Sequence, residues 1–159
     1  MSSEQDLLYL AEAAKLSRYT MESSLGGPFG AVIVREGKII GRGWNCVTSS
    51  NDPTAHAEVM AIRDACRHLG TFSLAGCTIY SSCEPCPMCL AAIYWARLSR
   101  CVFSNTQADA AAIDFDDQFL YEQIPLPPEK RTLPMTHVPL EEAKQVFRDW
   151  LQKADRIPY

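Results

Sequence analysis

The stretch CTIYSSCEPCPMCLAAIYWA, residues 77–96, joins a run typical of a buried strand to a run typical of a helix. Its first part, residues 77–82, is rich in apolar and β-branched side chains and contains no glycine or proline. Pro85 and Pro87 fit only at a helix start, and no helix breaker follows them in this stretch. The sequence therefore predicts a strand that leads directly into a helix.

Two cysteines stand at the start of this predicted helix. Cys86 and Cys89 occupy positions i and i+3, so a helix places both sulfur atoms on one face, about one turn apart. This spacing suits chelation of a metal ion. Because the N–H groups at a helix start favour anions, we expect the helix to lower both thiol pKa values and to favour the thiolates that zinc binds.

A second helix start carries a histidine and a carboxylate, His56 and Glu58. The N-cap signal of Asp52, followed by proline, predicts a helix from there to about Leu69, ended by Gly70. Residues i and i+2 do not face each other in a helix. His56 and Glu58 can therefore serve one site only if it lies just beyond the helix start, where a second helix start can meet it.

His56, Cys86 and Cys89 would together give a zinc ion three protein ligands. Structural zinc sites usually have four protein ligands, whereas catalytic sites have three and leave one position for water or substrate. Zinc lowers the pKa of a bound water towards about 7, and a nearby carboxylate such as Glu58 can then carry its proton. The pattern predicts a hydrolytic zinc site.

Three other interpretations of these residues remain open at this point. Cys83 extends the run to C-x-x-C-x-x-C and could close the site as a fourth ligand, which would make the zinc structural. The protein would then be a zinc-stabilised interaction module. Alternatively, Cys86 and Cys89 could be a redox pair. We favour the catalytic site, because Cys83 precedes the prolines and is expected at a strand end.

Composition and charge limit the classes of protein that this chain can belong to. With 159 residues, 47% of them hydrophobic, the chain is long enough for one domain with its own core, so we expect a single domain over 1–159. The net charge is −4 and no dense Lys/Arg cluster is present, which disfavours nucleic acid as a partner and favours a small molecule.

The same sequence predicts a cytoplasmic protein. The N-terminus lacks the basic and apolar regions of a signal peptide, and no stretch has the length of a membrane span, so we expect no membrane association. The seven cysteines are odd in number and scattered through predicted helices and strands. That distribution suits reduced thiols better than a disulfide framework.

Helices and strands are predicted to alternate along the first two thirds of the chain. Strands that alternate with helices indicate an α/β fold with crossover connections and a sheet covered on both faces. An amphipathic helix precedes Gly26, and a hairpin turn is expected at Glu36-Gly37. The expected strands are residues 29–35, 38–44, 77–82 and 100–104.

The pattern changes beyond residue 105. A helix is expected over residues 114–124, a proline-rich break over 125–128, a short strand over 136–139 and a last amphipathic helix over 140–153. The proline cluster fits an inert linker. It also fits a stiff arm that carries the last helix onto a partner subunit.

The whole chain resembles the cytidine deaminase-like superfamily and, within it, the family of small bacterial guanine deaminases. H-x-E followed by P-C-x-x-C is the signature of the zinc-dependent nucleobase deaminases. Phe115-Asp116-Asp117 and the terminal Tyr159 narrow the resemblance to the guanine family. The matching segments are residues 27–34, 50–58, 82–89, 92–97, 115–117 and Tyr159.

This resemblance implies a three-layer α/β/α fold with a five-stranded mixed sheet and one Zn²⁺ per subunit. It implies His56, Cys86 and Cys89 as metal ligands, Glu58 as proton shuttle and Asp117 as a second catalytic acid. It also implies a homodimer in which the C-terminal segment, 125–159, crosses to the partner subunit. The implied substrate-binding residues are Phe29, Asn45, Ala57, Trp95 and Tyr159.

The resemblance implies hydrolytic deamination of guanine to xanthine and ammonia, in purine catabolism or salvage. The substrate would be a purine base, a small molecule, in line with the acidic net charge. Guanosine, cytosine and tRNA adenosine remain alternative substrates within the superfamily. A carboxylate facing the donors of guanine would disfavour analogues that leave it unpaired.

Overall fold

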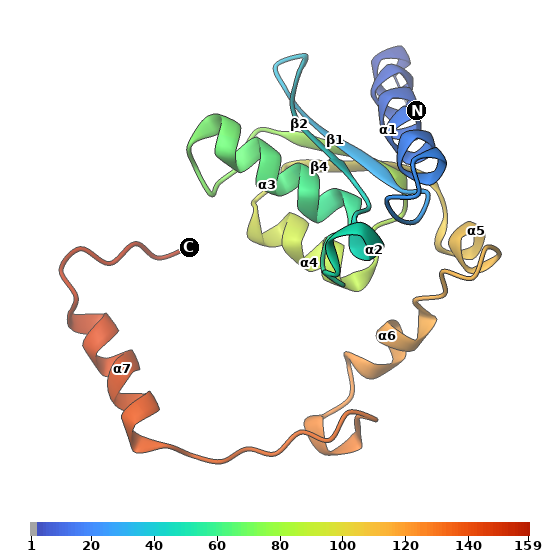
Figure 1. Cartoon of the computed structure of the whole chain (residues 1–159). Coiled ribbons are helices and arrows are strands. Elements are labelled where there is room, and N and C mark those ends of the chain that lie inside the picture. The colour runs from blue at the N-terminus through green and yellow to red at the C-terminus, as the bar shows by residue number, and fades with distance from the viewer. Residues whose placement is uncertain (1–2) are drawn as a thin grey trace. The chain divides into compact units, whose positions relative to one another are not determined.

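The computed structural model describes residues 3–159, and four strands in this part of the chain form one mixed sheet in the order β2-β1-β3-β4. β1 is antiparallel to both β2 and β3, whereas β3 and β4 are parallel. The α/β class is confirmed (Figure 1). The strands are β1 Gly30–Arg35, β2 Lys38–Trp44, β3 Thr78–Cys83 and β4 Arg100–Asn105.

The implied fifth strand is wrong for the described residues, whose sheet has four strands. The short strand predicted over residues 136–139 has irregular backbone. Pro134 and Pro139 flank this run, and a proline has no N–H to donate to a strand ladder. The sequence suggested a short strand there without identifying a neighbour for it to pair with.

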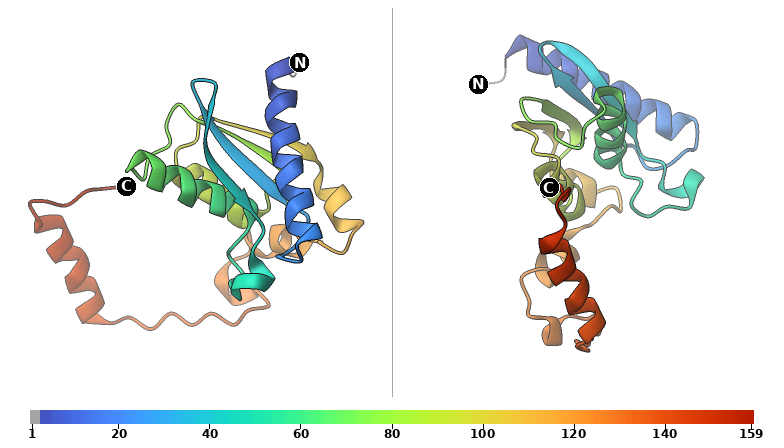
Figure 2. Two further views of the ribbon diagram at one scale, coloured as in Figure 1. Left: turned by 45° about the horizontal axis from the view of Figure 1, so that its top comes forward. Right: turned by 90° about the vertical axis from the view of Figure 1, so that its left-hand side faces the viewer.

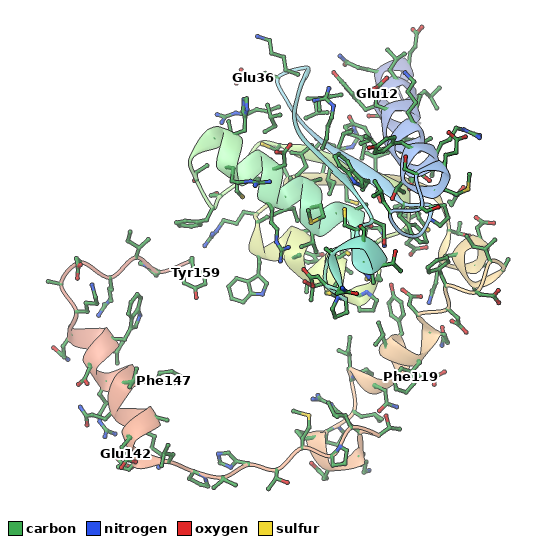
Figure 3. The ribbon with its side chains drawn as sticks, viewed as in Figure 1. Glu12, Glu36, Phe119, Glu142, Phe147 and Tyr159 are labelled. Carbon is green, nitrogen blue, oxygen red and sulfur yellow. The ribbon has the colours of Figure 1, made fainter. Side chains whose placement is uncertain are left out.

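A tight turn joins β1 to β2, as the sequence predicted. Glu36 and Gly37 both have positive φ, 50° and 75°, which is the backbone of a two-residue hairpin turn of the type that matches strand twist. Figure 3 shows Glu36 at the tip of this hairpin. The turn sets the register in which Arg35 pairs with Lys38.

Helices cover both faces of the sheet (Figures 1 and 2). Helix α1, Glu4–Glu22, packs on the face that carries Val32, Val34 and Tyr80. Helices α3, Ala57–Leu69, and α4, Pro87–Trp95, pack on the opposite face. The alternation of side chains along β1 therefore supplies two separate apolar cores, as expected for a sheet in a three-layer arrangement. The second core contains Ala31, Ile33, Ala61 and Ile79.

Two glycines of β2 allow α3 to lie very close to the sheet. A Cβ atom at Gly43 would be 2.1 Å from the carbonyl oxygen of Ala57 and 2.3 Å from the amide nitrogen of Ala61. At Gly41 it would be 2.7 Å from the carbonyl oxygen of Ala61. Backbone atoms cannot rotate away as a side chain can, so any larger residue would push α3 outwards. The start of α3 thus depends on these glycines.

A buried carboxylate of α1 joins this helix to the central strand β3 and the edge strand β4. Asp6 accepts two hydrogen bonds of 2.8 Å from Arg100 of β4 and one of 2.9 Å from the hydroxyl of Tyr80 in β3. These hydrogen bonds, above all those from Arg100, lower the pKa of Asp6. Asp6 therefore holds three elements together in its ionised form.

The C-terminal part of the chain is a separate compact unit. Residues up to Gln118 form one unit, and Phe119–Tyr159 form a second. Helix α7, Glu141–Gln152, contains no buried residue, and Phe147, which projects from it in Figure 3, is 77% exposed. The other short helices are α2 Val47–Ser50, α5 Gln107–Ala111, α6 Gln118–Gln123 and η1 Pro128–Lys130. Among residues 3–159, no helix combines the length and the apolar character that a membrane span requires.

Candidate metal centre and pocket

Three side chains converge where two helices begin. His56 is the N-cap of α3, Cys86 is the N-cap of α4, and Cys89 lies in the first turn of α4. The sulfur atoms of Cys86 and Cys89 are 3.6 Å and 3.5 Å from Nδ1 of His56. One nitrogen and two sulfur donors within this distance suit zinc, and they leave a position open for water or substrate.

The start of α3 differs from the prediction and brings His56 closer to the site than expected. Asp52 does not cap the helix, because its Oδ1 accepts hydrogen bonds from the backbone and the hydroxyl of Thr54, at 2.8 Å and 2.6 Å. This local turn competes with helix formation. The helix therefore begins at Ala57, and His56 stands at its N-cap with extended backbone.

The two candidate thiol ligands differ in the direction of their pKa shifts. A hydrogen bond from Cys89, reinforced by His56, lowers the pKa of Cys86, so its thiolate is favoured. The hydrogen bond to Cys86, together with burial, raises the pKa of Cys89. The expectation that both thiol pKa values are lowered is confirmed for Cys86 and wrong for Cys89. The hydrogen bond to Cys86 also raises the pKa of His56.

Cys83 lies outside the ligand group. It is the last residue of β3, and its thiol donates a hydrogen bond to the backbone oxygen of Thr106 at 3.6 Å. Burial raises the pKa of this thiol to about 11. The three ligand atoms of His56, Cys86 and Cys89 lie within 4.8 Å of one another without it. This arrangement favours an open, three-ligand site over a closed one.

Glu58 is a buried carboxylate beside the candidate ligands. It is 6% exposed, and its Oε1 accepts a hydrogen bond of 3.1 Å from the hydroxyl of Ser81 in β3. Burial raises the pKa of Glu58 above the usual value for a glutamate. A carboxylate in this environment takes up a proton more readily than one on the surface, as a proton shuttle must.

A pocket of about 420 Å³ opens beside these residues, a volume within the usual range for small-molecule sites. The residues with charged side chains in its lining are mostly acidic. It contains five carboxylates and one histidine, and no lysine or arginine occurs among these lining residues. These carboxylates are Glu58, Glu84, Asp114, Asp116 and Asp117.

Asn45 is buried in the pocket wall and is held by its side-chain oxygen. Oδ1 accepts hydrogen bonds from the backbone N–H groups of Gly27, at 3.3 Å, and Val47, at 3.2 Å. These two bonds occupy the acceptor end of the amide. The amide nitrogen is therefore the group that Asn45 offers to the pocket, so a ligand meets a donor here.

The wall opposite the metal ligands comes from the segment that follows β4. The backbone N–H of Gln107 donates to Glu84 at 3.0 Å, and its side-chain nitrogen donates to Oδ1 of Asp117 at 2.8 Å. Phe115 packs edge-on against Phe29, with their ring centroids 4.9 Å apart. This wall thus combines one aromatic pair with a group of acidic side chains.

The structure brings most, but not all, of the predicted site residues together. Ala57 is completely buried at the start of α3 and does not line this pocket. Trp95 is 65% exposed at the end of α4 and also lies outside the lining. Tyr159 belongs to the second unit. The predicted residues that do line the pocket are Phe29, Asn45, His56, Glu58, Cys86 and Asp117.

Sequence reasoning missed several residues of the site. Gln107, Glu84 and Ser81 received no role, although each contacts a carboxylate or supplies one. A signal for Gln107 was present, because Thr106 and Asp109 form a reciprocal capping box that begins a helix at this residue. For Ser81, no local sequence pattern predicts its hydrogen bond to Glu58, which is 23 positions away in the chain.

Comparison with known proteins defines the class. Residues 3–105 match the cytidine and deoxycytidylate deaminase zinc-binding region, and the chain belongs to this family. It is 50% identical over 151 residues to guanine deaminase from Bacillus subtilis (strain 168), an alignment that covers 95% of this chain and 97% of that protein. The family assignment confirms the resemblance inferred from the motifs.

Other relatives extend this comparison. The X-ray structure of guanine deaminase from Bacillus subtilis superposes with a TM-score of 0.94 at 48% identity, covering 100% of this chain and 99% of that one. A guanine deaminase from Nitrosomonas europaea gives a TM-score of 0.67 at 28% identity over 81% of this chain and 70% of that one. The tRNA-specific adenosine deaminase of Buchnera aphidicola subsp. Schizaphis graminum is 41% identical over 69% of this chain and 72% of its own length.

Proposed function

We propose that the protein is a zinc-dependent aminohydrolase that converts guanine and water to xanthine and ammonia. One observation carries this proposal: the pocket wall from Gln107 to Asp117 lies beyond the family match, which ends at residue 105. The similarity to the Bacillus subtilis guanine deaminase extends over 95% of the chain. The region that matches the family, residues 3–105, would supply the metal ligands and Glu58. The wall from Gln107 to Asp117 lies outside that region and supports guanine as the substrate.

His56, Cys86 and Cys89 would hold one zinc ion per subunit. When bound, zinc acts as a Lewis acid and lowers the pKa of water. Glu58 takes the proton that water gives up as its oxygen bonds to C2 of guanine, and delivers that proton to the adjacent ring nitrogen. C2 then carries a hydroxyl and an amino group. Loss of ammonia transfers the hydroxyl proton to nitrogen, and Asp117 relays it.

Other residues of the pocket orient the base. The amide nitrogen of Asn45 would donate to an acceptor of guanine, which carries oxygen and ring-nitrogen acceptors as well as an amino donor. The acidic wall would receive that amino group and the ring N–H. Phe29 would contact the face of the ring beside Phe115. Backbone donation by Ala57 and contact with Trp95 are proposed on the resemblance alone.

The acidic pocket also favours a free base over nucleic acid. Five carboxylates without a lysine or arginine among the lining residues would repel the phosphates of a tRNA, whose binding depends on basic side chains. Ammonia release from a panel of guanine, guanosine, cytosine, adenosine and an anticodon stem-loop RNA tests this. We expect guanine to be the preferred substrate, and release from guanosine but not from guanine would overturn the proposal.

Removal of zinc separates a catalytic site from a structural one. We expect a chelator to abolish activity and leave the circular dichroism spectrum folded, because two apolar cores hold the sheet and its helices independently of the metal. Unfolding on chelation would instead favour a zinc-stabilised interaction module. Reaction of Cys86 or Cys89 with thiol reagents in the zinc-loaded protein would favour redox chemistry.

We also propose that residues 1–159 act as a single domain in a homodimer whose C-terminal segments, 125–159, are exchanged. The apolar side chains of α7, among them Val146, Phe147 and Leu151, are exposed and require a partner surface. In this dimer the partner's Tyr159 would cover the pocket. We place the protein in the cytoplasm, where the free thiols of its seven cysteines, all in the described part of the chain, are stable.

Mixed dimers test this exchange. A Glu58→Gln chain and a Tyr159→Ala chain are each expected to be impaired alone. In an exchanged dimer of the two, one pocket has Glu58 from its own chain and Tyr159 from the Glu58→Gln chain, so activity is restored. If each arm served its own chain, no mixed dimer would contain a complete site, and mixing would give no recovery.

A further inference from the structure

Gln107 is in direct contact with two carboxylates of the pocket. Its backbone N–H donates to Oε2 of Glu84 at 3.0 Å, and its side-chain Nε2 donates to Oδ1 of Asp117 at 2.8 Å. The residue is half-buried and lines the pocket. It is the first residue of α5, whose start is fixed by the capping box of Thr106 and Asp109. Through Gln107, the fixed start of α5 is thus connected to the carboxylate of Asp117, which belongs to the same wall of the pocket.

Asp117 has little other support. It is the last residue of a segment without helix or strand, residues 112–117, between α5 and α6. Its neighbour Asp116 accepts a hydrogen bond of 2.9 Å from the backbone N–H of Gln118 and so caps α6. For Asp117, the hydrogen bond from Gln107 is the side-chain contact that sets the direction of the carboxylate.

An uncharged amide is well suited to hold a carboxylate that must gain and lose a proton. A lysine or arginine at this position would stabilise the ionised form and oppose protonation. The amide of glutamine does not titrate and can donate to Oδ1 in both protonation states. Because an unprotonated carboxyl oxygen is the better acceptor, this donor at Oδ1 favours a proton on Oδ2 when Asp117 carries one.

We propose that Gln107 is a positioning residue that fixes which oxygen of Asp117 carries the proton. The inference rests on the proposed function, in which Asp117 relays a proton during loss of ammonia. As the C2–N bond breaks, its electron pair stays with nitrogen, and nitrogen receives a proton from Oδ2. That proton comes from the hydroxyl on C2, which gives it to Oδ2 and becomes the carbonyl of xanthine, so Asp117 ends the step in the state in which it began and the protons balance.

The test compares Gln107→Leu with a matched control, Asp109→Ala. Leucine retains the size of glutamine without a donor, whereas Asp109→Ala weakens the start of α5 without touching Asp117. We expect Gln107→Leu to lower kcat for guanine roughly 10- to 100-fold, the effect of a misplaced catalytic group, with little change in KM. Asp109→Ala loosens the helix start that carries Gln107 but keeps the amide donor, so it should lower kcat less than Gln107→Leu does. Both variants should retain zinc.

A double variant shows whether Gln107 acts through Asp117. Gln107→Leu should have no further effect in an Asp117→Asn background, because residues that act as one unit are not additive. Independent, multiplying losses would overturn the proposal, as would a kcat of Gln107→Leu equal to that of Asp109→Ala.

A second variant covers the case in which Gln107→Leu does not fold. Gln107→Glu has the same length and replaces the donor by an acceptor, so it should also lower kcat at constant KM. Wild-type activity in this variant would overturn the proposal. If the wild-type protein released no ammonia from guanine, the proposed function would fail as well. A normal wild type with an unaffected Gln107 variant refutes the positioning role alone.

Discussion

The two walls of the pocket differ in how they are built. The metal side comes from the starts of α3 and α4, and Cys89 and Glu58 are buried there. The opposite side comes from α5 and an irregular segment, where Phe115 is 44% exposed and Asp117 is held by a hydrogen bond from Gln107. Buried, regular elements open less readily than exposed segments. The metal side is therefore the more rigid part of the pocket, whereas the wall that carries Asp117 depends on a few hydrogen bonds and is the easier part to alter.

The largest effect is expected on the metal side, from Glu58→Gln. The amide cannot accept the proton that water gives up, so turnover should fall roughly 10²- to 10⁴-fold. Zinc content, measured by metal analysis, should stay at one ion per subunit.

Cys86→Ser is the contrasting variant, since it should lose both zinc and activity. Near-normal turnover in Glu58→Gln would show that the proton shuttle is elsewhere. Loss of zinc from Glu58→Gln would make this residue part of the metal site instead.

A smaller effect is expected on the opposite wall, from Asp117→Asn. Asparagine retains the size of the side chain but cannot relay a proton, so we expect kcat to fall about 10²-fold, at the lower end of the range for acid–base groups. KM and zinc content should change little. Steady-state kinetics with guanine distinguish this from a binding role, for which KM would rise and kcat would persist.

A substitution at Asn45 tests whether its amide nitrogen donates a hydrogen bond to the substrate. Asn45→Asp retains an oxygen that can accept from Gly27 and Val47, but it removes the donor that faces the pocket. We expect kcat/KM to fall about 10-fold or more, because a buried acceptor of the base is left unpaired. Asn45→Ala should in addition lower the thermal midpoint. A normal kcat/KM in Asn45→Asp would assign Asn45 a purely structural role.

The smallest effect on activity is expected far from both walls, at Asp6. The hydrogen bonds from Arg100 lower the pKa of Asp6 in the folded state. Its contribution to stability is therefore complete above the unfolded pKa of about 4, declines below that value and is lost as the pH falls through the lower folded pKa. Asp6→Asn should be less stable than the wild type at pH 7, and the difference should shrink towards pH 3. Activity at pH 7 should be unchanged.

Urea denaturation across this pH range measures the effect at Asp6. Glu22→Gln is the control, because Glu22 forms an exposed ion pair with Arg18 on the same helix and should give little pH-dependent change. A constant difference between the wild type and Asp6→Asn at every pH would show that the carboxylate charge is not what joins α1 to the strands.

Much of the metal side could be predicted from the sequence because its determinants are local. Pro87 at the first position of α4 and the spacing of Cys86 and Cys89 place two candidate ligands without any knowledge of distant contacts. The predicted start of α3 lies too early in the chain. Aspartate is common both as a helix cap and in tight turns, and Asp52 forms a turn with Thr54 instead of a cap.

The opposite wall was less predictable because it depends on hydrogen bonds between distant residues. Helix α5 was missed, and the helix expected over residues 114–124 is reduced to α6, Gln118–Gln123. The bonds from Gln107 to Glu84 and Asp117 join three segments of the chain. The fifth strand was implied by the resemblance and not by the residues themselves, and the sheet of the described residues has four strands.

The close contact between β2 and α3 has a consequence for variation of this enzyme. Gly43 lies against the first turn of α3, on the side of that helix away from solvent, and does not line the pocket. A single added methyl group there would shift the backbone between His56 and Glu58. A mutational library restricted to pocket residues would omit this position. A random library scored for lost activity should nevertheless find Gly43 among the least tolerant positions of the chain.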